Sequence, residues 1–249
     1  MNDRPLGQIS APPRSDVMAA LGRLDLELLR PYCDPVWLDG QVTPMLSFGI
    51  RPGRPMWAAP ASVLTCSSHV RWRLQQAPGH SAFSSSILSA HTHLLQVISQ
   101  GESGQVTLCA RRPGTLGTWD LSWGPIVCTS GTLLAAWGAV QIDTQRPNDH
   151  DTAAIGSIGA FVHVVSGQGV VVVHTGGDLM ERQLAPQEAM MVSLGHLAAF
   201  SPGVTWGIQA VPSGMRLGAE NLFIERVTGP GWALIQGIRG PAPGADREG

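Results

Sequence analysis

Two histidines, His91 and His93, are the residues of this chain whose types and spacing best suit metal chemistry. On a strand, alternate side chains point to one face, so both imidazoles would project together. Cupin-type metal sites use this spacing, but they also need a glutamate a few residues later. The next acid is Glu102, nine residues after His93, which is too far for that pattern. The sequence therefore favours a polar strand or loop, with a metal-dependent, cupin-like enzyme as the alternative.

Polar residues also recur at equivalent positions of segments that resemble one another. Gln100, His163 and Glu225 form one such set, and Arg111, His174 and Gln236 form a second. If the segments surround a common axis, the first set could converge there and bind a ligand or an ion. The alternative is that each residue marks the solvent-facing position of its strand, polar because the other face is buried.

Established catalytic motifs are absent from the sequence. It holds no G-x-S-x-G elbow, no phosphate-binding loop and no H-E-x-x-H zinc helix. Ser166–Gly169 is rich in glycine, but it joins two expected strands, so its glycines suit a tight turn. We therefore predict a protein that is not an enzyme and that needs no cofactor.

Charge and cysteine content limit the choice of partner and compartment. The net charge is −2, all 16 cations are arginines, and they are scattered. A nucleic-acid surface needs clustered positive charge, so none is expected. The four cysteines stand far apart without a C-x-x-C pair, which fits a reducing cytoplasm. We expect no signal peptide, and the sequence contains no apolar run long enough to span a membrane.

Internal repetition is the clearest structural signal. Ser103, Ser166 and Thr228 each open a glycine-containing turn before an apolar run, at spacings of 63 and 62 residues. One small β-unit repeated along the chain could bury its apolar face only against its neighbours. We predict an all-β fold, an antiparallel double-stranded β-helix or sandwich, built from about three pseudo-repeats of 62–63 residues. Trp72 and Trp206 occupy matching positions and are both expected in the core.

The ends of the chain differ from this repeated body. Val17, Leu21, Leu24 and Leu28 recur at helical spacing, which predicts one amphipathic helix over about residues 16–30. Its apolar stripe could cover the β-body, a second copy or a protein partner. We expect residues 1–40 to form an N-terminal extension, residues 41–240 the repeat β-domain, and residues 241–249 a disordered tail.

Three stretches resemble a known family, that of altered-inheritance-of-mitochondria protein twenty-four. They are Phe48–Gly53, the block from Pro113 to Ala136, and the closing Gly229–Gln236, and together they place the resemblance at about residues 45–240. The resemblance implies a β-rich fold grouped with the trp RNA-binding attenuation protein. It implies no catalytic residues. Eukaryotic members of the family are associated with organisation of the mitochondrial inner membrane.

The favoured function is therefore a non-enzymatic β-scaffold that associates with itself and binds another protein, either through strand edges or through the N-terminal helix. The alternatives are the metal-dependent enzyme and a small-ligand or RNA sensor. The sensor hypothesis rests on the implied fold alone.

Overall fold

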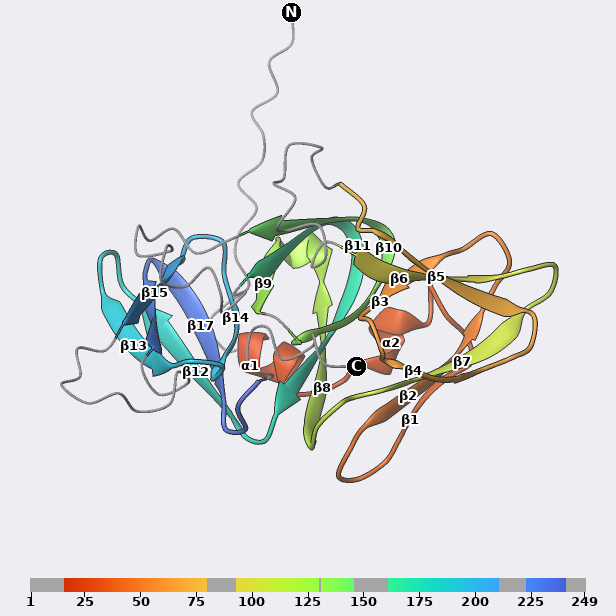
Figure 1. The fold of residues 1–249 in the computed structure, drawn as a ribbon, viewed down its shortest axis with the longest axis horizontal. Coiled ribbons are helices and arrows are strands. Elements are labelled where there is room, and N and C mark those ends of the chain that lie inside the picture. Colours follow the sequence, from red (N-terminus) through yellow and green to blue (C-terminus); the bar gives the residue numbers. More distant parts are fainter. Residues whose placement is uncertain (1–15, 80–92, 130, 146–160, 211–222, 241–249) are drawn as a thin grey trace, which may run out of the picture.

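The protein is described from a computed structural model over residues 16–79, 93–129, 131–145, 161–210 and 223–240 (Figure 1). These residues form mainly antiparallel strands, so the predicted all-β fold class is confirmed. The strands make three units in chain order. In Figure 1 the first unit lies on the right, the second in the centre and the third on the left.

The elements have the following bounds. The N-terminal part holds α1 (Asp16–Leu21), α2 (Leu26–Leu29) and β1 (Val36–Asp39). The first unit holds β2 (Met45–Ile50), β3 (Met56–Ala58), β4 (Val63–Cys66), β5 (Val70–Gln76), β6 (His93–Ser99) and β7 (Gly104–Cys109). The second holds β8 (Gly114–Asp120), a 3₁₀ turn (Leu121–Trp123), β9 (Ile126–Thr129), β10 (Leu133–Gln145) and β11 (Val162–Gly176). The third holds β12 (Leu179–Leu184), β13 (Ala189–Ser193), β14 (Leu197–Phe200), β15 (Thr205–Ala210), β16 (Phe223–Thr228) and β17 (Gly231–Gln236).

The three units share one pattern of strand pairing. In each, the first and third strands pair with the sixth, while the second and fourth pair with the fifth. In the second unit, β10 supplies the third and fourth strands, and β11 the fifth and sixth. A one-residue bulge interrupts each third strand, at Leu64, Leu134 and Ala198. The three segments that resemble one another in sequence thus share one pairing pattern. The tight turn expected at Ser166–Gly169 is wrong, because these residues lie inside the continuous strand β11.

Neighbouring units are joined by one recurring strand pair. The second strand of the first unit, β3, pairs with the third strand of the second unit, in β10. In the same way, β9 of the second unit pairs with β14 of the third. These two junctions carry one hydrogen-bonded sheet across all three units.

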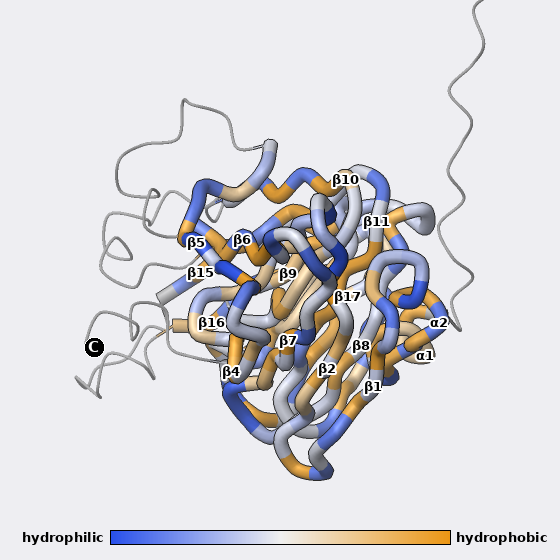
Figure 2. The backbone as a smooth tube through the Cα atoms, turned by 90° about the vertical axis from the view of Figure 1, so that its right-hand side faces the viewer, coloured by the Kyte–Doolittle hydropathy of each residue, from blue (hydrophilic) through white to orange (hydrophobic). Residues whose placement is uncertain are grey.

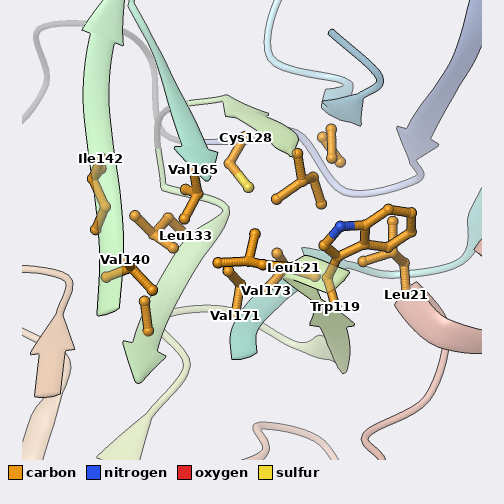
Figure 3. Close-up of a cluster of buried hydrophobic side chains, with 14 of the residues drawn as sticks. Leu21, Trp119, Leu121, Cys128, Leu133, Val140, Ile142, Val165, Val171 and Val173 are labelled. Atoms are coloured by element: carbon orange, nitrogen blue, oxygen red, sulfur yellow. The ribbon is translucent and has the colours of Figure 1, made fainter. Parts of the chain in front are cut away.

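The apolar core follows from alternation along the central strand. Val171 and Val173 point into a cluster with Trp119 and Leu133, shown in Figure 3. The intervening Val170 and Val172 point into a second cluster on the opposite face. The uninterrupted apolar run Val170–Val173 therefore lies in a strand covered on both sides, as its sequence indicated.

The N-terminal helix differs from the sequence prediction. Two short helices replace the single helix expected over residues 16–30. The chain breaks between them because Asp25 caps α2, with its side chain accepting a hydrogen bond from the Glu27 amide at 2.9 Å. The Asp25 amide donates to Thr118 Oγ1 at 3.0 Å, which fixes the break against β8.

The apolar residues of these helices are buried in their own chain. Leu21 and Leu29 are fully buried, each in a different core cluster. In the predicted stripe, Val17 and Leu21 are buried, and Leu24 and Leu28 are half-buried against the core. Of the three covers considered for the stripe, the structure thus shows the β-body. Residues 36–39 also belong to the β-body, because β1 pairs with β2, so the sheet begins before the expected boundary at residue 40. The tail expected at 241–249 lies outside the described residues.

Replacing Leu21 by alanine should lower the free energy of unfolding by about 2–5 kcal/mol, because the cavity would lie in the main core. Gly117→Ala should also destabilise the fold, since a Cβ at this position would lie 2.2 Å from the backbone oxygen of Leu21. Urea unfolding monitored by tryptophan fluorescence measures both effects. Arg23→Ala, on the exposed segment between the helices, is the control. A Leu21→Ala variant as stable as this control would show that the helices are not part of the core.

Candidate functional site

The predicted set Gln100, His163 and Glu225 does not share one environment. Gln100 is exposed in the turn after β6. His163 is buried in β11 and bonded to Thr144 Oγ1 at 3.2 Å. Glu225 is buried in β16 of the third unit.

Strand pairing shows why Gln100 stands apart. His163 pairs with Cys128 of β9, and Glu225 with Val192 of β13, each a second strand. The matching residue of the first unit is Leu95, which pairs with Ala58 of β3. One repeat position thus carries leucine, histidine and glutamate in the three units. Gln100 lies five residues beyond it.

Glu225 is a buried carboxyl group that accepts three hydrogen bonds within the third unit. Its Oε2 accepts hydrogen bonds from the amides of Gly195 at 3.0 Å and Leu197 at 3.5 Å. Its Oε1 accepts from Trp206 Nε1 at 3.2 Å. Burial raises the pKa of this carboxyl group to about 7, although the three hydrogen bonds act in the opposite direction. Both carboxyl oxygens accept hydrogen bonds from the protein itself, so Glu225 stabilises the turn before β14.

His174 and Gln236, two members of the second predicted set, belong to an adjoining buried network. Gln236 Nε2 donates to the Gly195 carbonyl at 3.0 Å, and its Oε1 accepts from the Gly176 amide at 2.9 Å. His174 Nε2 donates to the carbonyl of Arg112 at 3.0 Å. This network ties the end of β11 to the end of β17 and to the turn that Glu225 holds.

Two arginines complete the network, and sequence reasoning did not single them out. The Arg112 guanidinium donates to the carbonyl oxygens of Ile238 and Arg239. Arg239 Nε donates to the Leu194 carbonyl at 2.9 Å. Arg111, the third member of the predicted set, is exposed and lies beyond the end of β7. The buried polar groups are therefore engaged mainly with backbone atoms, which is an arrangement that holds two units together.

The metal alternative falls partly outside the described residues. His91 lies beyond them, and His93 opens β6, where it is half-buried and pairs with Gln76. Among the residues that the structure describes, no group of three His, Cys, Asp or Glu side chains could hold a metal ion.

The clearest surface feature is apolar. Among the described residues, nine large apolar side chains are exposed, and six of them fall between residues 37 and 74. They are Trp37, Leu38, Val42, Leu64, Trp72 and Leu74. They lie on or beside β1, β4 and β5, at the end of the molecule that faces the viewer in Figure 2. Sequence reasoning missed this surface because it placed Trp72 in the core.

Trp72 and Trp206 occupy the same repeat position, but they differ in burial. Trp206 is buried against Phe200, with ring centroids 6.4 Å apart, and donates to Glu225. At the positions of Phe200 and Glu225 the first unit carries Cys66 and Leu95, which offer neither a ring nor an acceptor. Trp72 is 48% exposed, so its expected burial is wrong while that of Trp206 is confirmed.

Comparison with known proteins now places the chain. Residues 37–238 match the family model described as Mitochondrial biogenesis AIM24. The chain belongs to the AIM24 family. This confirms the resemblance carried by Phe48–Gly53 and Gly229–Gln236, and extends it to include β1.

A solved structure supports the fold. The chain is similar to protein SPYM3_0169 from Streptococcus pyogenes, with a TM-score of 0.62 and 18% identity. The similarity covers 82% of this chain and 93% of that one. At this identity the likeness extends to the fold alone. No curated protein matches this AIM24-family chain.

Membrane insertion through a helix finds no support in the part of the chain that the structure describes, because neither short helix there has the length or apolar character to span a bilayer.

Glu225 and His174 should give opposite pH dependences of stability. The Glu225 pKa is raised from 4.5 to about 7, so its protonated form favours folding, and this contribution is lost as pH rises through about 7. Burial, with the nearby Arg112 charge, lowers the pKa of His174 from 6.5 to about 4. Its contribution is therefore present above pH 6.5 and is lost as pH falls through about 4.

Single variants separate the two effects. Relative to the unsubstituted protein, Glu225→Gln should lose about 3 kcal/mol of unfolding free energy as the pH falls from 7 to 4.5. His174→Gln should gain a similar amount between pH 6.5 and 4. Urea titrations at closely spaced pH values measure both differences. Parallel pH profiles for Glu225→Gln and the unsubstituted protein would show that Glu225 does not titrate in this range.

Proposed function

We propose that this AIM24-family protein is a non-enzymatic scaffold that acts by binding other proteins, including copies of itself. The observation that carries the proposal is the concentration of exposed apolar side chains between residues 37 and 74. Of these residues, Trp72 and Leu74 are neighbours on one face of β5, and apolar side chains grouped on a surface mark interaction sites more often than scattered ones do.

Strand β5 supplies the centre of the proposed binding face. Trp72 and Leu74 alternate along it, so both side chains lie on one face of an outer strand of the largest sheet. They are 48% and 60% exposed. Buried tryptophans contribute strongly to protein–protein interfaces.

The third unit indicates the chemistry of the partner. There, an aromatic ring from Phe200 covers the equivalent tryptophan, Trp206. A partner that inserts an aromatic or branched apolar side chain beside Trp72 would supply the cover that Cys66 does not give. Arg71 and Arg73 alternate with Trp72 and Leu74 on the same strand, so they are exposed on its opposite face and do not border this contact.

The proposal includes a cytoplasmic location. All four cysteines are free, and two of them, Cys33 and Cys128, are buried with pKa values that burial raises to about 12. Thiols of this kind pack as small apolar groups and suit a reducing compartment.

Replacing Trp72 and Leu74 together by serine should abolish partner binding with little change in stability, because both side chains are largely exposed. The measurement is photo-crosslinking from position 72 in native lysate, followed by co-purification with the serine variant. Met180→Ser, a substitution of an exposed side chain on β12 of the third unit, is the matched control. Equal recovery of the crosslinked partners by the double variant and the control would contradict the proposal.

A further inference from the structure

Among the described residues, the row of three units does not close on itself. Each end unit has one strand of the type that forms the junctions but that lacks a junction partner. Within the chain, the second strand of one unit pairs with the third strand of the next, as β3–β10 and β9–β14. Two strands of these types are left over. Among the described residues, β4 pairs only with β7, and β13 pairs only with β16.

The two leftover strands lie far apart in one molecule. Figure 1 shows β13 in the third unit on the left and β4 in the first unit, right of centre, with strands of the second unit between them. They therefore do not pair within one chain. A second copy, however, could bring its own β4 against β13.

We propose that β13 of one copy pairs antiparallel with β4 of the next, repeating the junction that joins units within the chain. The proposal deepens the proposed function by naming the self-association surface. The contact joins two different edges, so it is heterologous, and successive copies form a ring or a filament.

The internal junctions fix the register of this pair. Trp57 pairs with Ala136 in one junction, and Val127 pairs with Phe200 in the other. In the third strand of each unit, Cys66, Ala136 and Phe200 all stand two residues after the bulge residue, so Cys66 of β4 occupies the position of Ala136 and Phe200. In the second strand of each unit, Met191, Trp57 and Val127 pair with equivalent residues of the fifth strand, so Met191 of β13 occupies the position of Trp57 and Val127. Cys66 therefore faces Met191 across the new junction, and Thr65 faces Val192.

Residues at the internal junctions are less exposed to solvent than the matching residues at the two free edges. In the internal junctions Ala136, Val127 and Phe200 are buried. At the open ends Met191 is 53% exposed, and Leu64, the bulge residue of β4, is 54% exposed. A second copy would cover both.

The sequences of the two edges lack the usual protection against pairing. Natural edge strands carry charges or proline that prevent association. Neither Val63–Cys66 nor Ala189–Ser193 contains a charged residue or a proline. By contrast, the outer strands of the largest sheet do carry charges, with two arginines in β5 and Glu181 with Arg182 in β12. The outer strand β15 also lacks charge and proline, but of these unprotected edges β4 and β13 are the two that match the internal junction.

A disulfide tests the register. Directly opposed residues of antiparallel strands have Cα atoms about 4.5–5.5 Å apart, which is within the range that a disulfide spans. Met191→Cys should give, on mild oxidation, a ladder of crosslinked copies joined between positions 66 and 191, identified by peptide mass spectrometry. The ladder should vanish when Cys66→Ser is added. Met180→Cys, an exposed position away from both edges, is the control. A ladder absent from Met191→Cys, or equal in the control, would overturn the register.

Charged edges test the heterologous geometry by light scattering. The unsubstituted protein should exceed the monomer mass at high concentration, while Thr65→Lys and Met191→Lys should each remain monomeric because one edge is blocked. Each variant keeps the edge that the other lacks, so an equal mixture should form dimers and nothing larger. A monomeric unsubstituted protein, or a mixture that stays monomeric, would overturn the proposal. Either result would leave the binding face at Trp72 untouched, because that face is tested with its own variants.

Discussion

The pairing of β10 with β11 is the interaction on which the rest of the structure depends. These two long strands pair over twelve registered positions, and β11 also receives β8 and β9. Because Val170–Val173 are apolar on both faces, the strand needs cover from both sides. Most core residues of the first unit and α2 contribute to one cluster, while α1, strands of the third unit and Leu94 of β6 contribute to the other. The central strand pair thus determines where the outer units must lie.

The units share their pairing but not their side chains, and this difference separates structural from binding roles. At one repeat position Glu225 braces a turn, His163 bonds to Thr144, and Leu95 makes no polar bond. The third unit fills its core with Phe200 and Trp206, whereas the first unit leaves Trp72 exposed. Because the first unit leaves its aromatic side chain uncovered, we place the proposed binding face on that unit.

Because the same type of strand pair joins each two neighbouring units, the two ends of the row of units carry the two strands of that pair. The strand pairing that joins the first unit to the second, and the second to the third, leaves one donor edge at β13 and one acceptor edge at β4. The self-association that we propose would in this sense continue the fold. It also explains how a protein whose buried polar groups serve its own backbone could act through assembly.

Much of the fold could be predicted from the sequence, because it depends on local signals. The recurring glycine-containing segments at Ser103, Ser166 and Thr228, together with alternating apolar residues, indicated the antiparallel strands and the family, although Ser166 lies inside β11 and not in a turn. The apolar stripe holding Leu21 indicated helix at the N-terminus. Only the tertiary structure decided which repeat positions are buried. Trp72 and Trp206 look alike in sequence, but their burial depends on Cys66 and Phe200, which reach them through strand pairing. The position matching His163 is Leu95 rather than Gln100 because register is set between strands, and spacing along the chain does not record it.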